Sequence, residues 1–340
     1  MDSSGMQQVT GWQQPAVRFV LLYLACAGFL IGSAYARLPG NVTLTFLGHS
    51  KTFHDFGLMV LRNLIVPALI LPLMALVEMV CVGWHDSSLR DWLRYHDRST
   101  RSDLVMFVLV RVTPIFHVIS LVLTLGFSEI SGDALRVWLL ETGHIDLSLA
   151  RLPLPAMALC YLLVHTFFNY WEHRIQHTRL FWPIHRFHHA AEEFSLVTAD
   201  RIHPGDFATV FFSVFLVGLF QVSAVVYLGY ALVLSVLRFT IHSRIDTDFG
   251  WVGRYLVLSP GHHRAHHIAD EEKSGGNFGL IPLWDVLFGT LQPAVRRSTP
   301  IGVEDRYRHG YWVVFDLLRD TRDFFFNWLG AVRNLARLRA

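Results

Sequence analysis

The chain has 340 residues, of which 52% are hydrophobic and only 16% are charged, against about 25% charged residues in a typical soluble domain. This excess of apolar residues predicts an integral membrane protein. The formal net charge of +2 provides no strongly basic surface, so we expect no nucleic-acid partner. Cys26, Cys81 and Cys160 lie in apolar runs without CxxC spacing, which favours buried thiols over disulfides or metal thiolates.

Apolar segments at four places predict membrane-spanning helices, each close to the roughly 20 residues that cross a bilayer. They cover residues 17–36, 62–84, 103–127 and 152–171. A longer apolar stretch, residues 207–242, is interrupted by Gln221, Gly229 and Tyr230, and it predicts either two short spans or a re-entrant hairpin. The expected fold is therefore an all-α integral membrane protein with four transmembrane helices plus a helical hairpin.

The distribution of arginine predicts the orientation, because basic loops are retained in the cytoplasm. The loop after the second predicted span carries Arg90, Arg94, Arg98 and Arg101, whereas residues 128–151 carry two arginines beside several acids. We therefore expect the amino terminus, residues 90–101, residues 173–201 and the chain from residue 243 onward to be cytoplasmic, and residues 128–151 to be external. The predominance of arginine over lysine favours a bacterial coding sequence, and hence a bacterial inner membrane.

The last segment, residues 311–339, has apolar residues at helical spacing and arginines away from that stripe. This pattern predicts an amphipathic helix. Two placements stay open, one on the membrane surface and one against the cytoplasmic domain. The expected organisation is three spans in residues 1–150, a histidine-rich dimetal domain in residues 151–300 and an amphipathic tail in residues 301–340.

Histidine is the unusual residue of this chain, because eleven of its 19 histidines fall between His173 and His267. They form an HxxxH cluster at 173–177 and HxxHH clusters at 185–189 and 263–267. On a helix, residues three and four apart are neighbours on one face, so each cluster presents several imidazoles together. Three such clusters on the same predicted side of the membrane supply enough nitrogen ligands for two metal ions.

Other classes of protein use histidine as well. A zinc hydrolase needs only three or four ligands and usually carries HExxH, whereas residues 172–177 read EHRIQH. A metal transporter would place its ligands near the bilayer midplane, but these clusters follow the ends of apolar segments. A haem protein with two histidine ligands is the remaining non-enzymatic alternative. His117 and His165 lie inside predicted spans, where we expect hydrogen-bonded buried histidines and not metal ligands.

The sequence resembles the membrane-bound fatty acid hydroxylase and sterol desaturase superfamily, whose pattern is HxxxH, HxxHH, a lone histidine and a second HxxHH. The resemblance covers about residues 155–292. It rests on the runs NYWEHR at 169–174, HHAAEEF at 188–194, TADRIHP at 198–204, TIHS at 240–243, SPGHHRAHH at 259–267 and NFGLIPLWDVLFGT at 277–290.

The resemblance implies that nine histidines bind metal, and these are His173, His177, His185, His188, His189, His242, His263, His266 and His267. It also implies two iron ions as cofactors and O2 as co-substrate. The expected protein is a membrane-bound non-haem di-iron oxygenase that hydroxylates or desaturates a C–H bond of a lipid-like substrate, such as a sterol, a fatty acyl chain or an alkyl lipid. Electrons would come from an external ferredoxin, a cytochrome or a reduced pterin.

Five further residues lie close to these motifs. His203 is either a tenth ligand or a hydrogen-bond partner of a ligand, and we favour the partner. Asp246 is either a carboxylate ligand or a solvated loop residue, and we favour the solvated residue. Glu192 and Glu193 either orient a ligating imidazole through its other nitrogen or form an exposed acidic pair. We expect His262 at the surface or facing the substrate.

Overall fold

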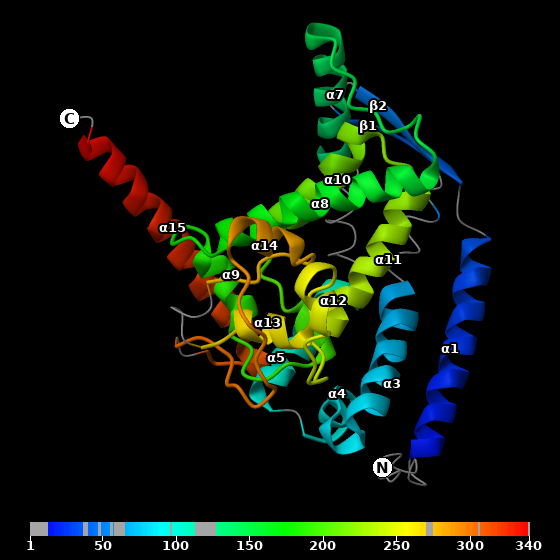
Figure 1. Cartoon of the computed structure of the whole chain (residues 1–340), viewed down its shortest axis with the longest axis vertical. Coiled ribbons are helices and arrows are strands. Elements are labelled where there is room, and N and C mark those ends of the chain that lie inside the picture. The colour runs from blue at the N-terminus through cyan, green and yellow to red at the C-terminus, as the bar shows by residue number, and fades with distance from the viewer. Residues whose placement is uncertain are drawn as a thin grey trace.

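The computed structural model describes residues 13–36, 40–46, 49–54, 57, 65–95, 97–112, 127–269, 275–304 and 307–338. Within these residues the protein is mostly helical (Figure 1). Most of the third predicted span, residues 113–126 with His117, lies outside the described residues.

The amino-terminal part consists of long apolar helices and one small sheet. Helix α1 covers Gln13–Tyr35, and helix α3, Leu71–Val82, continues a π-helical turn at Val66–Ile70. Both run side by side along one flank of the molecule (Figure 1). In the sequence between these helices, strands β1, Asn41–Phe46, and β2, His49–His54, pair as an antiparallel hairpin. The all-α expectation is therefore wrong for this segment, where Val42, Thr43 and Thr45 supply the β-branched side chains that favour strands.

Short helices connect α3 to the middle of the chain. A 3-10 turn at Trp84–Asp86 precedes α4, Ser88–Arg90, and a π-helical turn at Asp91–Tyr95. Helix α5, Arg98–Phe107, continues into a π-helical turn at Val108–Val112. Asp97 caps α5 by accepting a hydrogen bond from the backbone N–H of Thr100 at 2.7 Å.

The segment expected as an external loop contains a helix, α7, Ile130–Gly143. It crosses α10, Phe207–Phe220, at two facing glycines. A Cβ on Gly132 would lie 2.1 Å from the carbonyl oxygen of Phe215, and a Cβ on Gly218 would lie 2.1 Å from that of Glu129. The two backbones approach this closely because neither glycine has a side chain, as at many helix crossings in membranes.

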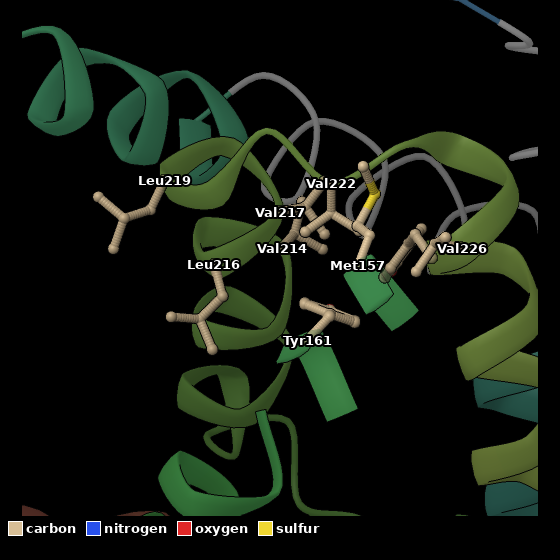
Figure 2. Packing of buried hydrophobic residues seen from close by; sticks show 9 residues of the cluster. Met157, Tyr161, Val214, Leu216, Val217, Leu219, Val222 and Val226 are labelled. Carbon is tan, nitrogen blue, oxygen red and sulfur yellow. The ribbon is translucent and has the colours of Figure 1, made fainter. Parts of the chain in front are cut away.

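Three helices form the larger apolar core. Helix α8, Leu154–Gln176, packs against α10 and against α11, Ala224–Ile241. Figure 2 shows Met157 and Tyr161 of α8 next to Val214 of α10 and Val226 of α11. The break between α10 and α11 lies at Gln221, which has a left-handed φ of 50°, so residues 207–242 form two helices.

Among the described residues, one helix, Ala224–Ile241, is both long and apolar enough to cross a membrane. Leu21–Ser33 and Val66–Val82 are apolar but shorter. The presence of four membrane-spanning helices therefore remains a prediction.

A compact group of short helices follows the long ones. It contains α9, Trp182–His189, a 3-10 turn at Leu196–Asp200, α12, Gly250–Tyr255, α13, Pro260–His266, and α14, Leu283–Phe288. Helix α15, Val313–Leu338, follows a 3-10 turn at Gly310–Trp312. Its first half packs on α9, and its second half extends away from the body of the molecule (Figure 1). The sequence left two placements open for the tail, on the membrane surface or against the histidine-rich domain. The first half of α15 takes the second placement, because it packs on α9.

Candidate metal centre

The histidine clusters lie at the ends of four helices. His173 is in the last turn of α8 and His177 follows it as the C-cap, while His242 directly follows α11. The HxxHH clusters occupy α9 and α13, and each helix begins with a proline in its first turn, where the missing N–H costs nothing. Ser259 also caps α13 by accepting a hydrogen bond from the backbone N–H of His262 at 3.2 Å.

The nine predicted histidines gather into two groups, and within each group one ligand atom per residue lies within 4.8 Å of all the others. The five-histidine group contains His173, His177, His185, His189 and His266. The four-histidine group contains His188, His242, His263 and His267. Both groups consist of imidazoles alone.

Each HxxHH helix contributes to both groups. On α9, His185 and His189 belong to the five-histidine group and His188 to the other. On α13 the division is reversed, since His263 and His267 belong to the four-histidine group and His266 to the five-histidine group. Helical geometry accounts for this division, because residues four apart are about 40° apart around the axis and consecutive residues about 100° apart. In the HxxHH spacing of α9 and α13, two imidazoles of each helix therefore point to one group and the remaining imidazole points to the other.

The imidazole nitrogens approach each other closely. The Nε2 atom of His173 lies 3.1 Å from that of His185 and 2.9 Å from that of His266. In the four-histidine group, Nε2 of His242 lies 2.9 Å from Nε2 of His263 and 3.3 Å from Nε2 of His188. Two nitrogens that each bind one ion at about 2.1 Å are roughly 3.0–3.4 Å apart for bond angles near 90–109°. The observed separations match those of neighbouring ligands of one ion.

Backbone carbonyls orient four of these rings. The Nδ1 atom of His173 lies 2.8 Å from the carbonyl oxygen of Phe278, and that of His266 lies 2.7 Å from the oxygen of Gly276. Because a carbonyl only accepts, Nδ1 carries the proton and Nε2 presents its lone pair to the group.

Main-chain carbonyls also orient two rings of the four-histidine group. The Nδ1–H of His188 donates to the carbonyl of Arg201 at 3.2 Å, and the Nδ1–H of His242 donates to that of Arg238 at 2.7 Å. Two rings of each group are thus held from outside by the main chain.

The chemistry of these histidines is suited to binding metal ions. Burial lowers the pKa of His173 to about 4 and that of His242 to about 3, so both rings are neutral near pH 7, as metal ligation requires. Nε2 of His177 and both ring nitrogens of His267 are buried and have no hydrogen-bond partner among the described residues. Leaving buried polar atoms unpaired is costly, and a metal ion in each group would satisfy one nitrogen of each of these two rings.

The acidic residues proposed beside the ligands contact other groups. Glu193 pairs with Arg264 at 2.6 Å, and the exposed Glu192 lies 3.3 Å from Nε2 of His309. Asp246 accepts from the backbone N–H of Arg297 at 3.2 Å. The idea that Glu192 or Glu193 orients an imidazole finds no support in these contacts, because main-chain carbonyls take that position. Asp246 belongs to neither histidine group, in line with the favoured solvated loop residue.

The other histidines are also placed. Nε2 of His203 lies 3.1 Å from the carbonyl of Leu317, and its Nδ1 accepts from the backbone N–H of Gly205 at 2.8 Å. These contacts connect His203 to α15 and to its own turn, so its expected contact with a ligand is not found. His262 is buried, against the expectation of a surface position, because its Nδ1 lies 2.7 Å from Oγ of Ser259.

His165 is a hydrogen-bonded buried histidine, as expected. Its Nε2 lies 2.7 Å from Oγ of Ser213, and its Nδ1 lies 2.7 Å from the hydroxyl of Tyr230. The three residues come from α8, α10 and α11, so this contact ties the core helices together.

Buried ion pairs around the histidines were not anticipated from the sequence. Arg201, between α9 and α10, donates to Asp103 of α5 at 2.9 Å, and both side chains are fully buried. Arg111 pairs with Asp200 at 2.7 Å. Each pair joins residues about 90 or more apart in the chain, which no local pattern reveals.

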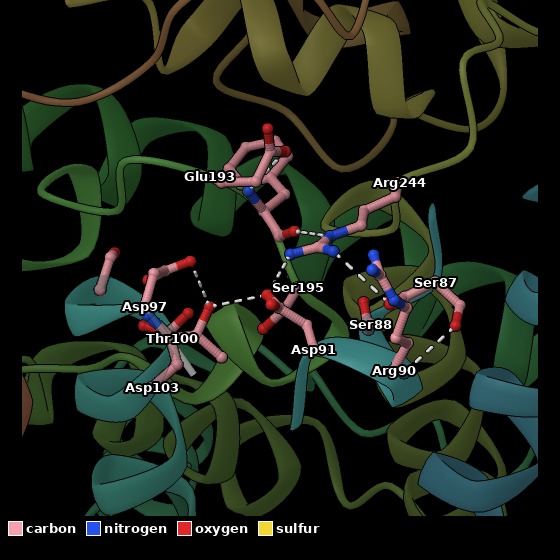
Figure 3. A network of polar contacts seen from close by, with 12 residues as sticks. Ser87, Ser88, Arg90, Asp91, Asp97, Thr100, Asp103, Glu193, Ser195 and Arg244 are labelled. Carbon is pink, nitrogen blue, oxygen red and sulfur yellow. Dashed lines mark hydrogen bonds and ion pairs between the residues drawn. The ribbon is translucent and has the colours of Figure 1, made fainter. Parts of the chain in front are cut away.

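A second network joins the segment after α11 to the short helices after α3. Arg244 donates to Asp91 at 2.6 Å and to the carbonyl of Phe194 at 2.7 Å (Figure 3). Buried Glu78 accepts from the backbone N–H groups of Arg244 and Ser88, at 2.8 and 2.7 Å. The amino-terminal half of the chain therefore supports the loops that carry the ligands.

Comparison with known proteins gives the same family resemblance as the histidine motifs. Residues 158–290 match the family model described as fatty acid hydroxylase, and all nine histidines lie inside this range. Over these residues, the chain resembles the fatty acid hydroxylase and sterol desaturase superfamily. No solved structure matches the chain significantly.

Two curated relatives illustrate the range of the superfamily. Alkylglycerol monooxygenase of Danio rerio is 29% identical over 128 residues, which are 36% of this chain and 28% of that protein. Methylsterol monooxygenase 2-2 of Arabidopsis thaliana is 30% identical over 149 residues, which are 41% of this chain and 55% of that protein. The chain thus spans about a quarter and about half of the lengths of these two relatives.

Proposed function

We propose that this protein is a membrane-bound non-haem di-iron oxygenase that uses O2 and external electrons to hydroxylate or desaturate a C–H bond of a lipid-like substrate. The observation that carries the proposal is the pair of adjacent groups made only of buried or half-buried imidazoles. The two relatives support the reaction class, because both are named as monooxygenases, one of an alkylglycerol and one of a methylsterol.

In this proposal, one iron is held by the five-histidine group and the other by the four-histidine group. The bound irons would supply reductive activation of O2 for attack on an unactivated C–H bond. The protein's own contribution would be to keep the rings neutral, to fix the Nε2 atoms of four rings through main-chain carbonyls and to limit the access of water to the site. His173 and His242 illustrate this, because a main-chain carbonyl accepts from the Nδ1–H of each ring.

A zinc hydrolase fits this site less well. Such enzymes use three or four protein ligands and a nearby carboxylate base. Here the two groups together contain nine imidazoles, and neither includes a carboxylate within the described part of the chain. The two glutamates closest in sequence to α9 point to Arg264 and His309, so they do not supply a base.

The membrane arrangement is part of the proposal. We place three spans in residues 1–150, the dimetal domain in residues 151–300 and the tail in residues 301–340, with the histidine groups on the cytoplasmic side of a bacterial inner membrane. A lipid-like substrate would enter from the bilayer, and a ferredoxin, a cytochrome or a reduced pterin would deliver electrons from the cytoplasm.

Metal analysis combined with lipid analysis tests the function. Protein purified from iron-supplemented cells should contain two metal ions per chain, and lipids of matched strains with and without the gene should differ by one oxygen or by two hydrogens in mass spectra. Iron is labile and zinc binds nitrogen sites more tightly, so the stoichiometry is the decisive number. One ion per chain in protein with intact histidine clusters would refute the dinuclear centre.

Reporter fusions test the orientation. We expect fusions at Asp97 and at the carboxy terminus to report the cytoplasm and a fusion at Asp133 to report the outside, because arginines cluster in residues 90–101. Reporters at Asp97 and Asp133 that gave the same side would contradict the third span.

A further inference from the structure

Helix α15 presents an apolar face that nothing in the described part of the chain covers. Leu318, Phe325, Leu329 and Val332 recur at intervals of three to seven residues, and each is more than half exposed. The opposite face is anchored, since Asp320 is fully buried and pairs with Arg186 of α9 at 2.7 Å. One face of the helix therefore packs on the protein, and the other face can contact another apolar surface.

A basic cavity lies at the beginning of this helix. Its volume is about 430 Å³, and it is lined by Arg98, Arg101, Arg308, His309, Gly310, Tyr311 and Trp312. Arg98 and Arg101 come from α5, and the other residues come from the turn before α15. Three guanidinium groups thus border one cavity, and no carboxylate is among the described residues that line it.

The walls of the cavity are fixed by contacts outside it. The guanidinium of Arg308 lies 5.3 Å from the ring centre of Phe315, and buried Asp316 accepts from the backbone N–H groups of Arg308 and His309, each at 3.0 Å. Ser102 of α5 accepts from the backbone N–H of Gly310 at 2.8 Å. The turn that carries Arg308 is therefore held against the helix that carries Arg98 and Arg101.

His309 is a neutral member of the cavity's lining. Arg201 donates to its Nδ1 at 3.0 Å, which leaves the proton on Nε2, the atom that faces exposed Glu192 at 3.3 Å. The carboxylate of Glu192 therefore lies next to the histidine of the cavity's lining.

Guanidinium groups recognise phosphate through paired hydrogen bonds. Tyrosine and tryptophan are the side chains that concentrate at the interface between lipid and water, and here Tyr311 and Trp312 border the arginines and are 78% and 58% exposed. The apolar face of α15 begins at Leu318, six residues after Trp312. Positive charge, interfacial aromatics and an exposed apolar helix face together match the headgroup and acyl layers of an anionic membrane.

We propose that the cavity bordered by Arg98, Arg101 and Arg308 binds the phosphate group of an anionic phospholipid, with the apolar face of α15 inserted in the adjacent acyl layer. The proposal goes beyond the oxygenase reaction and needs only that the protein resides in a membrane. It assigns a lipid site to the carboxy-terminal helix, separate from the histidine groups.

Binding of short-chain lipids to the full-length protein in detergent tests this site. Dihexanoyl phosphatidylglycerol is titrated by calorimetry, with dihexanoyl phosphatidylcholine and inorganic phosphate as comparison ligands. The test variant Arg98→Gln/Arg308→Gln removes two of the cavity's charges. The control variant Arg296→Gln/Arg333→Gln removes two exposed arginines outside the cavity, so both proteins have the same net charge.

We expect the test variant to bind phosphatidylglycerol at least ~10-fold more weakly, since charge-assisted hydrogen bonds are lost, and the control to differ by less than about twofold. Phosphatidylcholine should bind more weakly than phosphatidylglycerol, because its cationic headgroup meets the arginines. An equal loss in both variants, or equal affinity for the two lipids, would overturn the proposal. Inorganic phosphate binding as tightly as phosphatidylglycerol would replace the lipid by a soluble phosphate ligand.

An Arg308→Lys variant guards against a folding artefact. The lysine keeps the positive charge but lacks the planar guanidinium that donates two parallel hydrogen bonds. Its affinity for phosphatidylglycerol should therefore fall between those of the wild type and the double variant. Metal content equal to that of the wild type shows that each variant is folded. A lysine variant as weak as the glutamine variant, with normal metal content, would contradict recognition by charge.

Discussion

Replacement of His242 by alanine is expected to reduce the metal content from two ions per chain to one and to abolish O2-dependent turnover. His242 is the one member of the two groups outside the three clusters, and its Nε2 lies 2.9 and 3.3 Å from those of His263 and His188. Its loss leaves the four-histidine group with three ligands and the five-histidine group complete. Elemental analysis of iron-supplemented protein measures the change.

His203→Ala serves as the matched control. His203 is also buried, but it contacts the carbonyl of Leu317 and the backbone N–H of Gly205. We expect this variant to keep two metal ions and a measurable remnant of activity. If His203→Ala lost metal as His242→Ala does, His203 would be a ligand and the two groups would be incomplete as described.

Replacement of Arg201 by methionine is expected to destabilise the protein by about 3–5 kcal/mol, because it leaves the buried carboxylate of Asp103 without its cation. Arg201 and Asp103 are both fully buried and 2.9 Å apart. Arg201 also donates to the carbonyl of Phe187 at 2.9 Å, so α9 loses support as well. The measurement is the free energy of unfolding in detergent, or the thermal midpoint where unfolding is irreversible.

The control is Arg296→Met, at the exposed pair with Asp246, where the arginine is 82% exposed. Such a pair contributes about 0–1 kcal/mol, so the variant should unfold close to the wild type. The double variant Asp103→Leu/Arg201→Met removes both charges, and it should recover part of the lost stability. Equal stability of Arg201→Met and the wild type would show that the buried pair does not hold this domain together.

The grouping of the nine histidines is the part of the molecule that the sequence predicts best. Spacing of three and four residues is a local property of a helix, so His185, His188 and His189 are legible as a cluster before any fold is known. His242 was found through the family pattern alone, because a single histidine at the end of an apolar segment has no spacing of its own. The structure brings these residues to one place through helices that are far apart in the chain.

Other features depend on contacts that a linear pattern does not contain. The pair Arg201–Asp103 joins residues 98 apart, and the carbonyl of Phe278 reaches His173 across 105 residues. Glu192 and Glu193 follow α9 closely in sequence, but their partners in the structure are His309 and Arg264. Helix α7 and the β1–β2 hairpin lie in segments that apolar length alone marks as loops.

The division of each HxxHH helix between the two groups makes their assembly interdependent. In the proposed dimetal centre, a helix that supplied two imidazoles to one ion and one to the other could not rotate or shift toward one site without disturbing the second. Insertion of a single residue before His188 in α9 would turn the following imidazoles by about 100° and exchange their targets. Occupation of one group should therefore fix α9 and α13 and prepare the other group, so that the apoprotein takes up its two ions with positive cooperativity.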